Sequence, residues 1–208
     1  GRLDTLLKEK EVFQKTELTP KLILITPSYG NNNLLKVCGI EIIELLLKFN
    51  FKVMLRPHFK TIKDSGNLID LIKEKFGKNP NFVLETGVIP TNLFHNSMCL
   101  ISDWSGISFE YAFTFERPVI FIDVPKKVLN LNSDNISTKP MEISIRNEIG
   151  SIVSPNNLES IIDILKTIQE NDLTSKKIQQ IRSETVFNIG KSAKTGASYI
   201  VQLLKTIN

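Results

Sequence analysis

A polar loop and a carboxylate interrupt an otherwise apolar stretch between residues 98 and 115. Ser105 and Gly106 stand where an apolar strand gives way to a helix, and Glu110 follows about one turn later. The first N–H groups of a helix lack intrahelical partners and carry a partial positive charge, so a phosphate bound there gains hydrogen bonds and a favourable dipole. Glu110 would repel phosphate and suits sugar hydroxyls instead. Ordinary helix capping, with Glu110 in solvent, is the alternative.

Two further loops carry groups suited to an anion. In the sequence RPHF, Arg56 offers a planar fork of donors and His58 can donate a hydrogen bond or a proton near neutral pH. In TPSYG, Ser28 lies in a tight turn after another apolar run. A purely structural histidine and a simple loop are the alternatives. TPSYG lacks both the glycine spacing of a dinucleotide site and the lysine of a P-loop, which excludes Rossmann oxidoreductases and P-loop ATPases.

Short apolar runs alternate with helical patterns along the chain. The runs that predict strands are 21–26, 51–56, 81–85, 98–102, 118–123 and 150–154. The patterns that predict helices are 33–49, 61–77, 90–96, 105–115, 155–171, 173–188 and 191–206, and residues 124–150 look irregular before the last strand begins. This alternation predicts an α/β fold, a doubly wound Rossmann-like parallel sheet with C-terminal helices. Ligands of such sheets bind beyond the carboxyl ends of the strands, where all three polar loops fall.

Composition sets limits on the kind of protein. Residues 1–20 are highly charged and predict a linker or leading helix, and residues 21–208 predict one nucleotide-donor-binding domain with a helical tail. No apolar run approaches the ~20 residues that span a bilayer. The net charge of +4 is a mild basic bias that fits an anionic substrate or a membrane surface. Basic patches interleaved with aromatic residues, which bind nucleic acid, are absent.

Other chemistries find no support in the sequence. No cluster of His, Cys and carboxylates has metal-ligand spacing, and no Gly-x-Ser-x-Gly elbow is present. Cys38 and Cys99 are far apart and predict two buried thiols of a reducing compartment. His95, on a short helix between polar residues, is expected in solvent. We therefore expect no metal and no cofactor.

Three stretches together resemble a known family. LITPSYG, RPHF and ISDWSGISFEYAFTFERPVIFID, within residues 21–123, are similar to the CDP-glycerol glycerophosphotransferases, which build teichoic acids and related surface polymers. The resemblance implies one half of a GT-B fold, in which two Rossmann-like domains face each other across a cleft and the C-terminal one holds the CDP-activated donor.

The resemblance also implies roles for individual residues. Arg56 and His58 would contact the donor phosphates, with His58 as the catalytic candidate that protonates the leaving phosphate. Ser105 and Gly106 would cradle the pyrophosphate, Glu110 would contact the donor, and Ser28 would supply the first-turn hydroxyl. Two positions depart from the family pattern: Gly106 stands for its second serine and Trp104 for its tyrosine.

The implied partners are a CDP-activated donor, a lipid-linked or polymer acceptor, and an N-terminal acceptor-side domain that this chain lacks. The implied location is cytoplasmic, peripheral on the inner face of the cell membrane. Two alternatives stay open: a UDP- or GDP-sugar glycosyltransferase domain of the same fold, and a non-catalytic interaction domain that has kept the fold.

Overall fold

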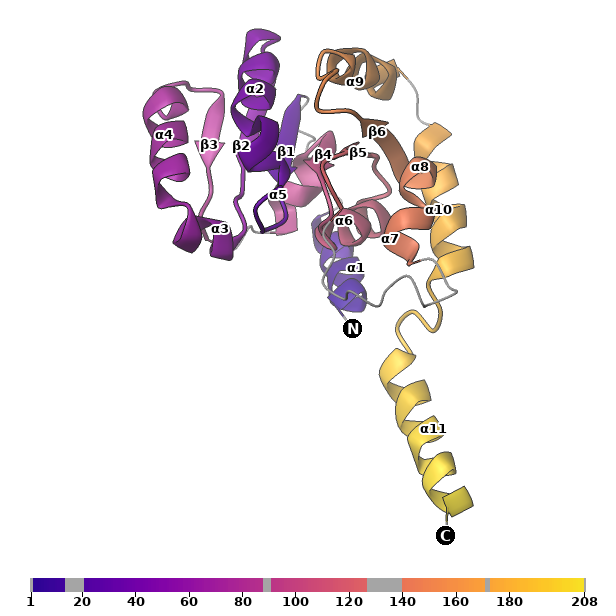
Figure 1. Cartoon of the computed structure of the whole chain (residues 1–208). Coiled ribbons are helices and arrows are strands. Elements are labelled where there is room, and N and C mark those ends of the chain that lie inside the picture. Colours follow the sequence, from indigo (N-terminus) through magenta and orange to yellow (C-terminus); the bar gives the residue numbers. More distant parts are fainter. Residues whose placement is uncertain (1, 14–20, 88–90, 127–139, 171–172, 208) are drawn as a thin grey trace.

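A single parallel sheet forms the centre of the molecule (Figure 1). The computed structural model describes residues 2–13, 21–87, 91–126, 140–170 and 173–207. The strands are β1 (Leu22–Thr26), β2 (Lys52–Leu55), β3 (Phe82–Leu84), β4 (Cys99–Ser102), β5 (Val119–Ile122) and β6 (Gly150–Val153). They pair in the order β3-β2-β1-β4-β5-β6, all parallel. The six predicted strands and the doubly wound α/β fold are confirmed.

Helices cover both faces of this sheet (Figure 1). One face carries α2 (Leu34–Lys48), α4 (Gly66–Phe76) and α9 (Ser160–Glu170). The other face carries α5 (Thr91–Asn96), α6 (Ile107–Phe115), α8 (Arg146–Ile149) and α10 (Leu173–Thr185), and α1 (Arg2–Phe13) packs outside α5 and α6. The remaining helices are α3 (Phe59–Asp64), α7 (Met141–Ser144) and α11 (Ser192–Ile207).

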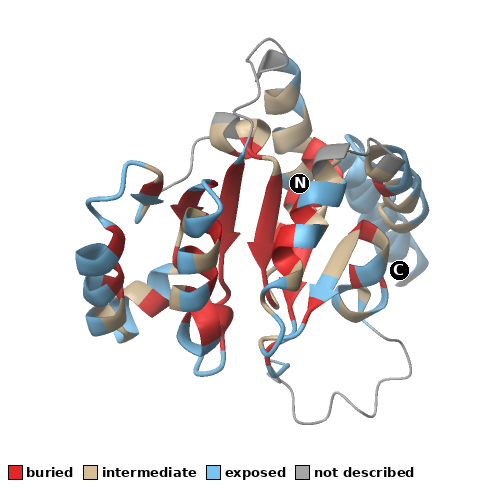
Figure 2. Cartoon of the chain, turned by 90° about the horizontal axis from the view of Figure 1, so that it is seen from above, coloured by how far each residue is buried: buried red, intermediate tan, exposed pale blue. Residues whose placement is uncertain are grey.

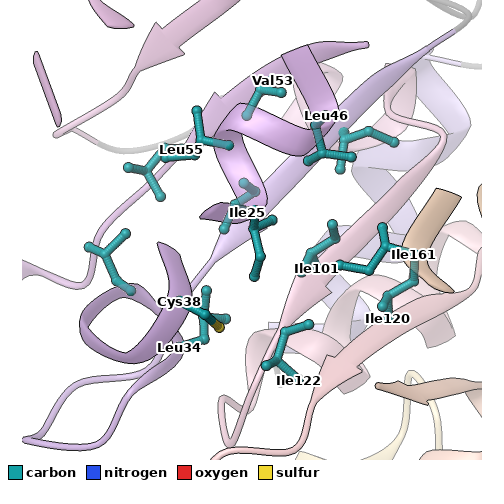
Figure 3. Close-up of a cluster of buried hydrophobic side chains, with 14 of the residues drawn as sticks. Ile25, Leu34, Cys38, Leu46, Val53, Leu55, Ile101, Ile120, Ile122 and Ile161 are labelled. Carbon is teal, nitrogen blue, oxygen red and sulfur yellow. The ribbon is translucent and has the colours of Figure 1, made fainter. Parts of the chain in front are cut away.

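Strand side chains alternate between two apolar cores. Ile23 and Ile25 of β1 point into the core beneath α2, while Leu22 and Leu24 point into the core beneath α6. Figure 3 shows the first core, where Ile25, Ile101 and Ile120 of neighbouring strands lie close to helix residues. The central strands are buried on both faces (Figure 2). Successive side chains of a strand point to opposite faces of the sheet, and both faces here are covered by an apolar core. The sequence of each strand is therefore a continuous apolar run.

Three sequence-based predictions about the elements were wrong. The helix expected over 61–77 is two helices, because Ser65, with φ of −142°, ends α3 and begins α4. Ser and Gly both favour helix ends over helix interiors, and Ser65-Gly66 stands at this break. Helix α9 begins at Ser160 and not at 155, since Pro155 lies in a turn closed by Asn157 N–H and Ser154 C=O. The stretch expected to be irregular contains α7 and α8.

The order of the strands reverses between β1 and β4, which places a crevice beyond their carboxyl ends. Away from that crevice, Cys38 and Cys99 are buried as free thiols, as predicted, and burial raises the pKa of Cys38 to about 12. Helix α11 extends away from the body, and residues 187–206 are all exposed (Figure 1). Within the described residues, no helix combines the length and the apolar character needed to cross a bilayer.

The two-sided core makes a direct prediction for stability. Ile101→Ala removes a fully buried side chain of β4 from the core beneath α2 and α9, and we expect it to lower the free energy of unfolding by about 2–5 kcal/mol. Leu71→Ala is the matched control because that side chain is 47% exposed on α4, and it should cost less than about 1 kcal/mol. Chemical denaturation measures both, and equal losses would contradict the assignment of this core.

Candidate functional site

A cavity of about 310 Å³ lies at the point where the strand order reverses. Residues that follow β1, β2, β3 and β4 line it. Five of the six predicted site residues are among them: Arg56, His58, Ser105, Gly106 and Glu110. Its volume is at the lower end of the ~300–1,000 Å³ usual for ligand sites. The sheet therefore brings the predicted anion-binding groups to one place.

Helix α6 begins at this cavity without a side-chain cap. Gly106 occupies the N-cap position in a helical conformation, and no described side chain accepts a hydrogen bond from the first turn. The neighbouring helix α2 is different. The Asn33 side chain accepts from Leu35 N and Lys36 N, and a carboxylate accepts from Leu34 N. Of these two helix starts, α6 is the one with donors suited to a ligand anion.

The carboxylate that caps α2 belongs to Asp103, which is 2% exposed. Its Oδ1 accepts from Ser28 N at 2.7 Å, and its Oδ2 accepts from Ser28 Oγ at 3.0 Å and from Leu34 N at 2.9 Å. Burial raises the pKa of the Asp103 carboxyl, while the hydrogen bonds from Leu34 and Ser28 oppose that rise. The carboxylate thus ties the loop after β4 to both ends of the loop after β1.

Trp104 anchors the same loop on its other side. Its Nε1 donates to Val124 C=O at 2.9 Å, and the guanidinium of Arg146 stacks on its ring at 4.1 Å. Arg146, buried on α8, also pairs with Asp123 at 3.3 Å. Its Nε and Nη2 are buried without a hydrogen-bond partner in the described part of the chain. The residues just before Ser105 are therefore held from two directions.

The loop after β2 presents Arg56 and His58 to the cavity. Arg56 N–H donates to Ile25 C=O at 2.9 Å, which extends the pairing of β1 with β2 up to this residue. Within the described ranges, Arg56 has no ion pair. Its fork of donors is therefore available to an anion.

His58 has a structural role as well as a place in the cavity. It is the N-cap of α3, where its Nδ1 accepts from Lys60 N at 3.2 Å. Its ring lies 4.6 Å from that of Tyr29, which connects the loops after β1 and β2. Because Nδ1 accepts, the neutral ring carries its proton on Nε2 and suits hydrogen-bond donation to phosphate. To act as an acid, the ring would have to carry a proton on both nitrogens, and a proton on Nδ1 would break the cap of α3. Proton transfer by His58 therefore stays a prediction.

Glu110 is not the solvated residue of the capping alternative. Its Oε2 lies 2.8 Å from Arg2 Nε, and its side chain is 29% exposed. Burial raises the pKa of the Glu110 carboxyl, and the Arg2 guanidinium offsets part of that rise. Sequence reasoning missed Arg2 because it lies in a charged leading helix with no motif around it. It also missed Asp103 as the cap of α2, since that contact joins residues 69 apart in the chain.

Ser28 lies in a neighbouring cavity of about 200 Å³, together with Asn31, Trp104 and Lys126. Its hydroxyl already donates to Asp103, so its predicted contact with a ligand stays a prediction. His95 lies outside both cavities. The expectation that it is in solvent was wrong, because it is half-buried beside Phe115 and burial lowers its pKa.

Comparisons with known proteins place the fold. No protein-family model matches the sequence, and no curated protein matches it significantly. Among solved structures, UDP-GlcNAc 2-epimerase from Neisseria meningitidis bound to UDP-GlcNAc is similar, at 19% identity and a TM-score of 0.60, over 96% of this chain and 53% of that one.

Two further solved structures are similar. The UDP-GlcNAc 2-epimerase of Methanocaldococcus jannaschii in complex with UDP-GlcNAc and UDP has 17% identity and a TM-score of 0.52, over 89% of this chain and 52% of its own. A glycosyltransferase from Rickettsia africae has 20% identity and a TM-score of 0.53, over 98% of this chain and 52% of its own. The chain spans about half the length of these structures. It has the fold of one Rossmann-like half of a GT-B protein, and the CDP-glycerol family is not confirmed.

The Asp103 contacts predict a stability effect. Asp103→Asn places an amide nitrogen against a backbone N–H in either orientation, so we expect the free energy of unfolding to fall by about 1–3 kcal/mol. Asp103→Ala leaves all three donors without their acceptor, so it should lower the free energy of unfolding further. Asp70→Asn, exposed on α4, is the control and should change stability by less than about 0.5 kcal/mol. Similar losses for Asp103→Asn and Asp70→Asn in urea titrations would contradict the proposed fastening.

Proposed function

We propose that this chain is the donor-binding half of a GT-B transferase and that its cavity binds a nucleotide-activated donor, such as a nucleoside-diphosphate sugar. The observation that carries this proposal is the convergence in one cavity of five residues: Arg56 and His58 from the loop after β2, Ser105 and Gly106 from the loop after β4, and Glu110 from α6. The two loops follow separate strands of the sheet, so their meeting is a property of the fold.

The diphosphate of the donor fits the positive side of the cavity. The uncapped start of α6 supplies the backbone N–H groups of Gly106 and Ile107, and Gly106 has no side chain to keep a ligand from the backbone. A Cβ built on Gly106 would meet no atom within 4 Å, so the space above this residue is open. Arg56 adds a fork of charge-assisted hydrogen bonds. These groups would also stabilise the charge that develops on the leaving nucleotide during transfer.

Glu110 gives the cavity a second, different contact. A carboxylate one turn along α6 accepts hydrogen bonds from neighbouring hydroxyls, such as those of a ribose or another sugar. The two kinds of group are separated along one helix, with amide donors at its start and an acceptor further along. That arrangement fits a ligand with phosphate at one end and a polyol at the other.

The second candidate is a CDP-glycerol glycerophosphotransferase. It is favoured by the motif over residues 101–113, whose Ser105, Gly106 and Glu110 all line the cavity. On this proposal the acceptor is a lipid-linked or polymer chain, a second half supplies the acceptor side, and the protein works at the inner face of the cell membrane. The phosphate contacts are common to CDP, UDP and GDP donors, so the nucleotide base has to be found by titration.

Calorimetric titration with CDP, UDP and GDP tests the site. We expect one of the three to bind and Arg56→Ala to weaken its binding about 10–100-fold, the effect of losing a charge-assisted contact. Ser105→Ala should weaken it less, because a neutral hydroxyl contributes less than a guanidinium. Lys78→Ala is the charge-matched control, since Lys78 is exposed before β3 at the opposite edge of the sheet.

Each outcome of this titration has a meaning. Preference for CDP supports the glycerophosphotransferase candidate, and preference for UDP or GDP supports a nucleotide-sugar glycosyltransferase. Binding that survives Arg56→Ala and Ser105→Ala unchanged would place the ligand elsewhere. If none of the three nucleotides binds, the donor-site proposal fails and the non-catalytic interaction domain becomes the better explanation.

Two substitutions of His58 separate its roles. Asn is a favoured N-cap residue, so His58→Asn should keep α3 capped and preserve stability, while His58→Ala should cost about 0.5–2 kcal/mol. Both variants should bind the nucleotide more weakly, because both lack the imidazole in the cavity. Thermal unfolding and calorimetry measured on the same samples distinguish the two effects. Wild-type affinity in His58→Asn would mean that His58 only caps the helix.

A further inference from the structure

We propose that Arg2, the first described residue of the leading helix α1, is a second guanidinium of the anion site and binds the diphosphate together with Arg56. This inference rests on the proposed function, because it concerns the same cavity. It adds a residue from outside the sheet, in a segment where the sequence predicts only a linker or leading helix. It also makes α1 part of the ligand-binding structure.

The contacts of Arg2 support this role. It lines the cavity beside Glu110, and the ion pair between them uses Arg2 Nε and Glu110 Oε2 at 2.8 Å. That contact does not consume the two terminal amino groups of the guanidinium. A guanidinium held at one edge by a carboxylate keeps a fork of donors for a second anion in the same plane. Glu110 thereby orients the cation that a diphosphate needs.

The charge of the cavity depends on Arg2. Besides the imidazole of His58, the titratable side chains that line it are Arg2, Arg56 and Glu110. Without Arg2, the charges of Arg56 and Glu110 would cancel. Arg56 would then bind a diphosphate with the opposing charge of Glu110 in the same cavity. Arg2 therefore makes the lining side chains more favourable to an anion.

A purely structural role, in which Arg2 only holds α1 against α6, explains these contacts less well. Its side chain is 62% exposed, and exposed ion pairs contribute only about 0–1 kcal/mol. Other contacts already hold α1 in place. Asp4 Oδ1 accepts from Gly190 N at 2.6 Å, Lys10 pairs with Glu116 at 3.2 Å, and Leu3 packs on the core beneath α6. The position of Arg2 at the cavity is thus set by the helix as a whole.

The test compares variants of the 208-residue chain for binding of inorganic pyrophosphate and of the tightest of CDP, UDP and GDP. We expect Arg2→Ala to weaken both about tenfold and to reduce the dependence of affinity on salt. Arg2→Lys should lie between Arg2→Ala and wild type, because it keeps the charge but not the fork. Lys8→Ala is the control, since Lys8 is exposed on the same helix and does not line the cavity.

The outcomes separate this inference from the proposed function. If Arg2→Ala binds both ligands within twofold of wild type while Arg56→Ala does not, Arg2 takes no part and the donor site still stands. If the wild-type chain binds neither ligand, both proposals fail. If Arg2→Ala lowers the unfolding temperature, the Arg2→Lys variant decides. Affinity restored to more than half of the wild-type value in Arg2→Lys supports a role for the Arg2 charge in binding. Affinity as low as that of Arg2→Ala, in an Arg2→Lys variant that is stable, overturns the inference.

Discussion

One buried carboxylate organises the edge of the sheet where the strand order reverses. Asp103 accepts hydrogen bonds from the backbone and hydroxyl of Ser28 and from Leu34, which lie at the two ends of the loop after β1. An ionised group in such a position is stable only when donors surround it. Since one of these donors, Leu34 N, is at the start of α2, the carboxylate helps to cap that helix and leaves the start of α6, three residues further along its own loop, for a ligand.

The same loop is fixed again through Trp104, so the candidate site is built on rigid parts. Trp104 connects it to the segment after β5 through Val124 and to α8 through the stacked Arg146. Tyr29 and His58 join the two loops on the other side of the cavity. A site positioned in this way holds its donors in place before the ligand arrives, so little ordering is needed on binding. Arg2 and Glu110 reach the cavity from helix surfaces that are partly in solvent.

The sequence predicted the sheet and much of the site because both depend on local patterns. Each strand is a short apolar run, and parallel topology sends every loop after a strand to one edge, so Arg56, His58 and Ser105 were expected together. Contacts between distant residues were not predictable. Asp103 stands just before α6 in the sequence, but its carboxylate accepts from the start of α2, 69 residues earlier. Arg2 had no motif at all, because its importance comes from where α1 packs and not from its neighbours in sequence.

The placement of the two thiols has a practical consequence. Cys38 lies where α2 departs from helical geometry, with φ of −154°, and Cys99 lies at the start of the central strand β4. Both are buried and burial holds their pKa values high, so neither presents a thiolate to an alkylating reagent while the domain is closed. Alkylation of either thiol therefore requires local unfolding, so the two cysteines report on two different opening events. Alkylation of Cys38 measures the local unfolding of α2, and alkylation of Cys99 measures the separation of β4 from the sheet.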